Sequence, residues 1–433
     1  MEMLYQYLWK QRLSGHHFTT VRGEKICVHS PGLHNTDAGP DFLNGRIQID
    51  GEEWVGNIEI HEHASDWYRH GHDSDPAYDN VILHVVGHDD ARIVMSDSRE
   101  LPQVVMTYPP SFETMYRALS AHIGDVACRD KISAIPPLHV ADWLSTLAID
   151  RMHAKADRIR NYAREFHNDW SRTCFVALAR AFGASLNGDP FEMLARSLPL
   201  NILAHHCDDI FQLQALLFGQ AGMLDTSLYM FDEYYQQLCR EYFFLARKYG
   251  LRPMRADIWK YARIRPGNFP HRRIAMLSHL LLDGFTLLGD MLDRRHDTEA
   301  LRHLFIWDAD GYWQTHSAFD RPGSAAQALS DSSVDLLLIN FVAPVLFAYS
   351  AAIGDLEACE KAFDIWEDLR PENNTFIRQW RSYGLEPRSA ADSQALLQLR
   401  KQFCDADRCL DCRFAAFLIR NSSDIITNQC PAT

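Results

Sequence analysis

The chain has 433 residues, of which 47% are hydrophobic and 23% charged, and its formal net charge is −14 at pH 7. This length exceeds what one hydrophobic core usually organises, so we expect two or three domains. The acidic charge argues against a protein that coats nucleic acid nonspecifically, because phosphate binding rests on clustered Lys and Arg.

The N-terminal stretch MEMLYQYLWKQRL predicts a short amphipathic helix. It lacks the basic start, the continuous apolar core and the small-residue cleavage site of a secretory signal. Six of the ten cysteines lie singly in apolar or helical contexts, which is typical of reduced thiols in a protein core. We therefore expect a cytoplasmic location.

Residues 25–107 have the pattern of a β-sheet. Short runs rich in β-branched residues are separated by turn signals such as Asp50-Gly51. The runs are KICVHS, GRIQID, EEWVGNIEIH, NVILHVV, ARIVMS and PQVVMT. Residues 63–79 are too polar and too rich in turn formers for a strand, so we expect a loop with room for one helical turn.

From about Ser111 onward, apolar residues recur at helical spacing, with Gly or Pro at the segment ends. The most apolar stretch, 334–352, contains Pro344 and polar residues, which predicts a buried, kinked helix and no membrane span. The sequence therefore predicts an α+β protein in three parts. These are a mixed α/β domain with a small central sheet at 1–110, an all-α region at 111–400 and a cysteine-containing segment at 401–433.

Carboxylates and imidazoles are concentrated in the predicted sheet. Side chains alternate between the two faces of a strand, so Glu59 and His61 would be neighbours on one face. Asp41 begins the preceding strand run, and a hairpin through Asp50-Gly51 can bring it beside Glu59. Two carboxylates at a sheet edge form an oxygen site for Mg²⁺ or Mn²⁺, and an adjacent base can orient the water that the metal activates.

The order Pro-Asp on one strand and Glu-x-His on the next resembles the PD-(D/E)xK nuclease-like fold, also called restriction-endonuclease-like. In that superfamily the Asp and Glu hold the metal, and a Lys two residues after the Glu assists the attacking water. The resemblance implies a metal-dependent phosphodiesterase acting on nucleic acid, with Asp41 and Glu59 as metal ligands. His61 stands where the superfamily has Lys.

A second interpretation is a transition-metal hydrolase, because two imidazoles and one carboxylate form a common open zinc or iron site. Its candidate ligands are His61, His63, Asp66, His70, His72 and Asp75. A third is a polar network that ties the loop to the sheet, with Trp67 and Tyr78 as packing anchors. His84, between apolar neighbours, is expected to be a hydrogen-bonded core histidine.

Several longer segments of the chain form a recognisable set, which is HNTDAGPDF, GNIEIH, SDW with the following His-x-His, YDNVILHVV, FGQAGML, RIRPGNFPHRRIAMLS and CLDC. Together they are similar to an uncharacterised bacterial family, domain of unknown function 2851. The resemblance spans nearly the whole chain and implies that it is one unit. It implies no substrate.

An arginine-rich turn precedes the helix that begins near residue 273. A rigid Pro-Gly turn that presents arginines at a helix N-terminus suits phosphate, and nearby aromatic residues can stack on bases. The candidate phosphate ligands are Arg263, Arg265, Arg272 and Arg273. Alternatively, these arginines pair with the acidic N-terminal domain and fix a contact between domains.

Cysteines are clustered near the C-terminus, where Cys404, Cys409 and Cys412 lie within nine residues and Cys430 follows. Short spacings of this kind can direct several sulfurs at one Zn²⁺ ion or at an iron–sulfur cluster. Reduced, partly buried thiols that cap the last helix are the alternative. For the whole chain, a non-catalytic scaffold that binds nucleic acid or protein is the alternative to an enzyme, and no feature indicates an oligomeric state.

Overall fold

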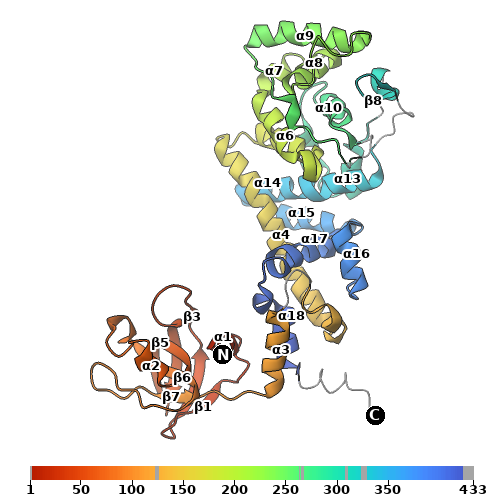
Figure 1. The fold of residues 1–433 in the computed structure, drawn as a ribbon. Helices are drawn as coiled ribbons and strands as arrows, with labels where there is room; N and C mark the ends of the chain where they lie inside the picture. The colour runs from red at the N-terminus through yellow and green to blue at the C-terminus, as the bar shows by residue number, and fades with distance from the viewer. Residues whose placement is uncertain are drawn as a thin grey trace, which may run out of the picture. The chain divides into compact units, whose positions relative to one another are not determined.

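The computed structural model describes residues 2–121, 126–262, 264, 268–307, 311–322 and 329–422 (Figure 1). It is an α+β protein with a mixed N-terminal sheet followed by a helical region, as predicted. Contacts between Cα atoms divide it into two units, Met1–Trp143 with Leu399–Thr433, and Leu144–Gln398. The first unit therefore runs past the predicted boundary at 110, as far as Trp143, and it also includes the C-terminal segment from Leu399 onward.

The first unit is built on one sheet with the strand order β1-β2-β4-β5-β6-β7, and β3 pairs with β4. The strands up to β5 pair antiparallel, whereas β5, β6 and β7 are parallel neighbours. The strands are β1 (His17–Thr19), β2 (Lys25–Ser30), β3 (Leu33–His34), β4 (Phe42–Ile49), β5 (Glu52–His63), β6 (Val81–His88) and β7 (Gln103–Val105).

A two-residue hairpin joins β4 to β5. Asp50 and Gly51 both have positive φ, at 46° and 96°, which matches the twist of the flanking antiparallel strands. The hairpin register holds as far as the pair Gly45–Gly56, and an irregularity in β4 then shifts it by one residue, so that Phe42 pairs with Ile58. Asp41, which precedes Phe42, therefore lies beside Glu59, which follows Ile58. These are the two carboxylates predicted to bind a metal.

The run ARIVMS, expected to be a strand, forms no ladder. Its side chains do alternate, with Ile93 and Met95 buried, but the segment makes one isolated bridge between Val94 and Glu100. Its hydrogen bonds close locally, from Met95 N to Arg99 O and from Leu101 N to Ile93 O. The prediction was wrong because the run folds back on itself within a few residues instead of joining the sheet.

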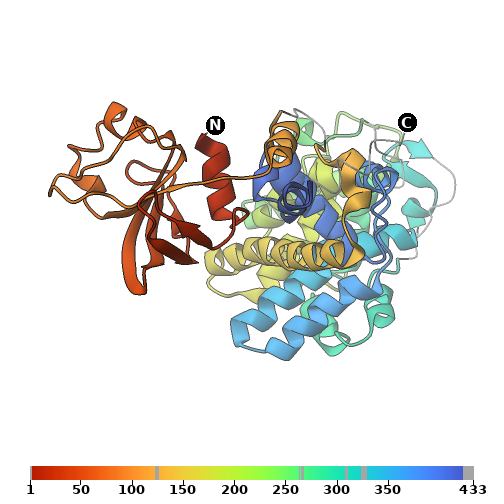
Figure 2. The same ribbon diagram turned by 90° about the horizontal axis from the view of Figure 1, so that it is seen from below.

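The polar segment between β5 and β6 is a loop with two short helical turns, α2 (Asp66–Arg69) and η1 (Pro76–Tyr78). Trp67 and Tyr78 are buried and pack edge to face. Helix α1 (Glu2–Lys10) packs against β5, and Figure 2 shows it beside the sheet.

The rest of the first unit is helical and comes from both sides of the second unit in the sequence. Helix α3 contacts α18 and η8, and α18 contacts η2. These elements are α3 (Pro110–Ser120), η2 (Arg129–Ala134), the π-turn η7 (Arg400–Cys404), η8 (Cys409–Asp411) and α18 (Arg413–Arg420).

The second unit is helical apart from a short hairpin, β8 (His316–Ala318) and β9 (Arg321–Pro322), and the turns η3 (Ala256–Ile258) and η5 (Gly311–Gln314). The unit boundary falls inside the long helix α4 (Pro137–Glu165). The other helices are α5 (Trp170–Phe182), α6 (Ala184–Ser197), α7 (Leu200–Ala204), α8 (Ile210–Gln220), α9 (Glu233–Tyr249), α10 (Pro270–His279), α11 (Leu287–Asp293), α12 (Thr298–His303), α13 (Asp331–Leu337), α14 (Ala343–Ile353), α15 (Leu356–Asp368), α16 (Thr375–Ser382) and α17 (Ala390–Leu399).

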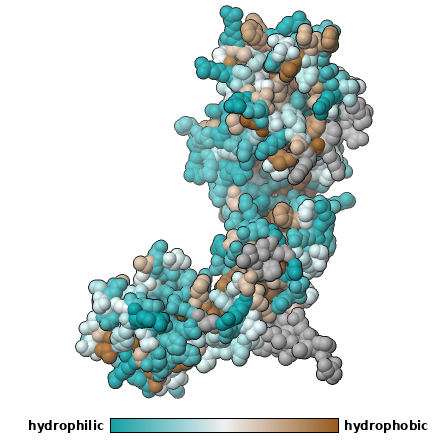
Figure 3. Space-filling model, in the orientation of Figure 1, coloured by the Kyte–Doolittle hydropathy of each residue, from teal (hydrophilic) through white to brown (hydrophobic). Residues whose placement is uncertain are grey.

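The helical stretch Asp331–Ile353 is long and apolar enough to cross a membrane, by length and composition alone. Within the second unit, 61% of the most apolar part of this stretch is buried. A buried core helix can be equally long and apolar. The π-turn η6 (Leu338–Val342) interrupts it just before Pro344, which has no N–H to donate to the preceding turn. The indole of Trp366 donates to the carbonyl of Ile339 in that turn. In Figure 3 the visible faces of both units are largely hydrophilic.

Candidate metal centre

Two functional side chains lie on one face of β5. Glu59 and His61 are 4% and 1% exposed, and Glu59 is paired with His84 on the parallel neighbour β6. Since the side chains of paired residues share a face, the imidazole of His84 lies next to this pair. His61 Nε2 is 3.5 Å from Glu59 Oε1.

The loop after β5 adds two imidazoles to this face. His72 Nε2 lies 3.4 Å from Glu59 Oε1, and His70 Nδ1 lies 3.2 Å from His61 Nε2. One ring nitrogen from each of the three histidines falls within 4.8 Å of both others. The loop therefore brings three imidazoles together, and the Glu59 carboxylate lies beside two of them, His61 and His72.

These spacings are those of atoms that share a metal ion. Ligands about 2.0–2.1 Å from one ion are roughly 3.3 Å apart in a tetrahedral site and roughly 3.0 Å apart in an octahedral one. The three donor–donor distances, 3.2, 3.4 and 3.5 Å, lie close to these values. Imidazole ligands suit zinc, copper, iron or nickel, whereas Mg²⁺ takes oxygen ligands.

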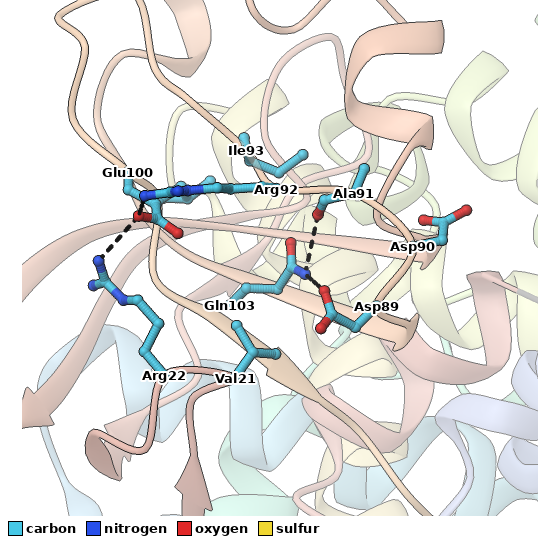
Figure 4. Close-up of a pocket in the computed structure, with 10 residues that line it drawn as sticks. Val21, Arg22, Asp89, Asp90, Ala91, Arg92, Ile93, Glu100 and Gln103 are labelled. Carbon is cyan, nitrogen blue, oxygen red and sulfur yellow. Dashed lines mark hydrogen bonds and ion pairs between the residues drawn. The ribbon is translucent and has the colours of Figure 1, made fainter.

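A chain of hydrogen bonds leads from His61 to an acidic surface residue. His61 Nδ1 is 2.9 Å from His84 Nε2, and His84 Nδ1 is 3.0 Å from Gln103 Oε1. The Gln103 amide donates to Asp89 Oδ1 and to the carbonyl of Ala91, as Figure 4 shows. Asp89 and Gln103 line a surface pocket of about 390 Å³.

This chain determines where the protons lie. The Gln103 NH₂ faces Asp89, so its oxygen accepts from His84 Nδ1–H, and His84 Nε2 must accept from His61 Nδ1–H. His61 Nε2 is then the unprotonated nitrogen, and its lone pair faces Glu59 and His70. In proteins, a metal-binding histidine is usually oriented by its other ring nitrogen, whose N–H donates to a nearby acceptor.

Aromatic packing holds His72 in place. Its ring stacks on Tyr78 with centroids 3.8 Å apart, and the edge of Trp67 meets it at 5.4 Å. Trp67 also contacts His84. The predicted packing anchors thus orient a candidate ligand as well as tying down the loop.

Asp41 lies next to Glu59 but makes other contacts. Its N–H donates to Glu59 Oε2 at 3.0 Å, while its two carboxylate oxygens accept from Gln6 Nε2 and from the N–H of Ile60. Glu59 is thus held by one oxygen and presents the other to the imidazoles. The sequence predicted the proximity of the two carboxylates. Asp41 acts by positioning Glu59 in this arrangement.

The pKa values of the centre reflect burial. Burial raises the pKa of both Glu59 and Asp41 well above their ordinary values, and the Asp41 charge raises that of Glu59 further. Burial lowers the pKa of His61 to about 2, with a further contribution from the neighbouring histidines, and lowers that of His72. The lowered pKa values of His61 and His72 favour their neutral imidazoles, which is the form that binds metal.

The centre reaches solvent on one side, because His70 is exposed while His61 is buried. Glu2, at the start of α1, is close enough to interact electrostatically with His70, and burial raises the pKa of its carboxyl. Glu2, Gln6 and Gln103 were not predicted to be site residues. No local pattern marks them, since each comes from an element distant in sequence.

The other predicted ligands lie outside the cluster. His63 pairs with Asp90 at the end of β5 and stacks on His88. Asp66 is buried, accepts from the N–H of His63 and pairs with Arg69. Asp75 caps η1 by accepting from the N–H of Ala77. Neither aspartate is directed at the three histidines.

The arginine prediction is not supported where the structure describes it. Arg272 and Arg273 are 4% and 8% exposed, and both lie in the second unit. Arg272 donates to the carbonyls of Trp313 and His316, and Arg273 donates to Asn268. Packing buries these guanidinium groups, so neither is presented to a phosphate. Arg263 and Arg265 lie outside the described residues.

The C-terminal cysteines are brought close together. Cys404 ends η7, Cys409 begins η8 and Cys412 caps α18, and these elements contact one another in chain order. The N–H of Cys412 donates to the carbonyl of Cys409 at 3.0 Å. Cys430, the predicted fourth ligand, lies outside the described residues.

Comparison with known proteins identifies the family. The model of the protein family described as "Protein of unknown function (DUF2851)" matches residues 2–375. The chain belongs to this family. The DUF2851 match covers the whole sheet and the histidine cluster and ends before the C-terminal cysteines. No curated protein and no solved structure matches the chain, so nothing in these comparisons supports the PD-(D/E)xK resemblance.

Proposed function

We propose that this DUF2851 protein is a metal-dependent hydrolase whose sheet binds one first-row transition-metal ion through Glu59, His61, His70 and His72. One observation carries the proposal, which is that ring nitrogens of three histidines from a strand and the following loop lie within 4.8 Å of one another. Glu59 Oε1 lies 3.5 and 3.4 Å from two of these imidazoles, His61 and His72. The fixed tautomer of His61 supports it, because the nitrogen that faces the cluster is unprotonated.

A bound metal of this type would polarise a substrate oxygen and lower the pKa of a water molecule. The residues of the chain supply the rest. Exposed His70 marks the side from which a substrate can approach, and the carboxyl of Glu2 lies near it to accept a proton. Buried Glu59 and His61 keep the opposite side closed to water.

A phosphodiester of nucleic acid is the substrate class we propose first. It is supported by the order of Asp41, Glu59 and His61 and by the adjacency of the two carboxylates. The buried arginines Arg272 and Arg273 add no support. A scaffold that holds a structural metal is the alternative, since four protein ligands close a tetrahedral site. We also infer a cytoplasmic location, which the free thiols of the nine described cysteines support.

The test compares metal loading and hydrolysis in the full-length protein. Metal-depleted protein is reloaded with Mn²⁺, Fe²⁺, Zn²⁺ or Mg²⁺ and assayed on single- and double-stranded DNA, on RNA and on a small aryl phosphodiester. His70→Ala is the main variant because His70 is exposed, so its removal should leave the fold intact. The matched control is His63→Ala, also exposed and in the same unit.

We expect a transition metal to support hydrolysis, His70→Ala to reduce it at least about 100-fold, and His63→Ala to leave it unchanged. Stoichiometric metal binding without hydrolysis of any substrate would favour the scaffold over the enzyme. Activity that needs only Mg²⁺ and survives His70→Ala would contradict the imidazole centre and return the metal to Asp41 and Glu59.

A further inference from the structure

A second cluster of potential ligands lies in the helical part of the first unit, apart from the histidine centre. Its members come from distant parts of the sequence. Cys128 caps the turn η2, and Cys412 caps helix α18, which contacts η2. Cys404 and Cys409 lie in the turns that precede α18.

The four thiols lie in elements that contact one another, because α18 contacts η2 and η8, and η8 contacts η7. Electrostatics agrees with this arrangement. Burial raises the pKa of Cys128, and the Cys412, Cys404 and Cys409 thiols each raise it further. The contact between η2 and α18 therefore groups Cys128 with the three C-terminal cysteines. None of the four forms a disulfide.

Hydrogen-bond donors surround one of these sulfurs. The main-chain N–H groups of Phe414 and Ala415 donate to Cys412 Sγ, at the N-terminus of α18. The indole of Trp143 is also buried near this sulfur, and its N–H has no hydrogen-bond partner among the described residues. Burial raises the pKa of the Cys412 thiol to about 11, and the N–H groups around it offset part of that rise by favouring the thiolate, which is the form that binds a metal.

We propose that Cys128, Cys404, Cys409 and Cys412 ligate one soft-metal centre, either an iron–sulfur cluster or Zn²⁺. The inference is independent of the proposed hydrolase, because it uses other residues. In this proposal Cys128 is the fourth ligand, the role for which the sequence suggested Cys430.

The spacing of the four thiols favours an iron–sulfur cluster over a single zinc ion. Among the described residues, the three histidines are the group whose ligand atoms all lie within 4.8 Å of one another. The thiols are therefore spread more widely than sulfurs on one zinc ion, which are roughly 3.8 Å apart for Zn–S bonds near 2.3 Å. An iron–sulfur cluster binds each thiolate through a different iron and spans a wider site.

The centre would tie helix α1 to the C-terminal segment. Tyr7 of α1 interacts with Cys412, and Lys10 pairs with Asp411, which directly precedes Cys412. The same helix carries Gln6, whose side chain holds Asp41. A metal that orders Cys412 therefore also helps to order the helix that supports the histidine centre.

The test is metal analysis with X-ray absorption spectroscopy on the full-length protein purified anaerobically. The measured quantities are iron, zinc and acid-labile sulfide per chain, and the number of sulfur ligands on the metal. Cys128→Ser is the main variant. Cys27→Ser is the matched control, because Cys27 is also a half-buried free thiol of the first unit. Cys430→Ser separates the two candidates for the fourth ligand.

We expect sulfur-only ligation in the wild type, with loss of metal or loss of one protein sulfur in Cys128→Ser alone. Iron with labile sulfide identifies a cluster, and zinc without sulfide identifies a zinc site. Absence of both metals from the wild type would overturn the proposal. So would a wild-type spectrum that survives in Cys128→Ser but changes in Cys430→Ser. If Cys128→Ser does not fold, a Cys430→Ser protein that keeps four protein sulfurs on its metal still supports the assignment.

Discussion

His61 Nδ1 lies 2.9 Å from His84 Nε2, so that one buried imidazole sets the tautomer of another. His84 is in turn oriented by Gln103, and Gln103 by Asp89. Through three hydrogen bonds, a carboxylate at a surface pocket therefore decides that His61 presents an unprotonated Nε2 to the cluster.

Removing the middle of this chain should weaken metal binding. In Gln103→Leu, His84 loses its acceptor, His61 loses its defined tautomer, and metal affinity should fall about 10- to 100-fold. Competition with a chromophoric chelator measures this affinity. Gln48→Leu is the control, since the side chain of Gln48 donates to its own turn, at Gly51 O. An unchanged affinity in a folded Gln103→Leu protein would show that the chain does not orient His61.

Metal binding should raise the melting temperature of the wild type. A ligand present at 100 times its Kd stabilises the native state by about 2.7 kcal/mol. His72→Ala removes one ligand, which His72 contributes from the loop at 3.4 Å from Glu59, so the shift should shrink or disappear. Differential scanning calorimetry with and without Zn²⁺ or Mn²⁺ measures it. An equal shift in both proteins would place the bound metal elsewhere.

The loop over the sheet should depend strongly on Trp67. This side chain is fully buried and contacts His72, Tyr78 and His84. Trp67→Ala should destabilise the first unit by about 3–5 kcal/mol because it removes a large apolar side chain and leaves a cavity. Trp54→Ala, at a half-exposed position of β5, should cost much less. Urea unfolding followed by circular dichroism measures both, and equal losses would contradict this role.

The second unit should be acid-sensitive at His271. Burial lowers the pKa of this imidazole to about 4, and it lies among the rings of Phe218, Phe319 and Tyr261. Between about pH 6.5 and 4 the unfolded chain binds this proton and the folded chain does not, so this contribution to stability is lost as the pH falls.

In His271→Phe the aromatic contacts are kept and the titrating group is removed. The melting temperature of the variant should therefore fall less than that of the wild type between pH 7 and pH 4.5. The control is His205→Phe, at an exposed histidine in the same unit. Parallel melting curves for wild type and His271→Phe across this range would show that the imidazole is not buried neutral.

Much of the first unit was predictable because its signals are local. The alternation along β5 placed Glu59 beside His61, and the Asp50-Gly51 turn paired the two strands that carry Asp41 and Glu59. An irregularity in β4 between Phe42 and Gly45, which the sequence did not reveal, then shifts the register by one residue and sets Asp41 beside Glu59. The same kind of reasoning failed for residues 91–96. Alternating burial does not specify which partner a strand has, and this run pairs with its own continuation.

The sequence by itself determined the α+β class, the strand faces, the hairpin and the grouping of Cys404, Cys409 and Cys412, because each depends on residues a few positions apart. Only the tertiary structure decided that His70 and His72 meet His61, that Gln103 orients His84, that Arg272 and Arg273 are buried, and that Cys128 joins the cysteines. These contacts depend on how a loop closes over a sheet and how distant helices pack, and the spacing of residues along the chain carries no record of either.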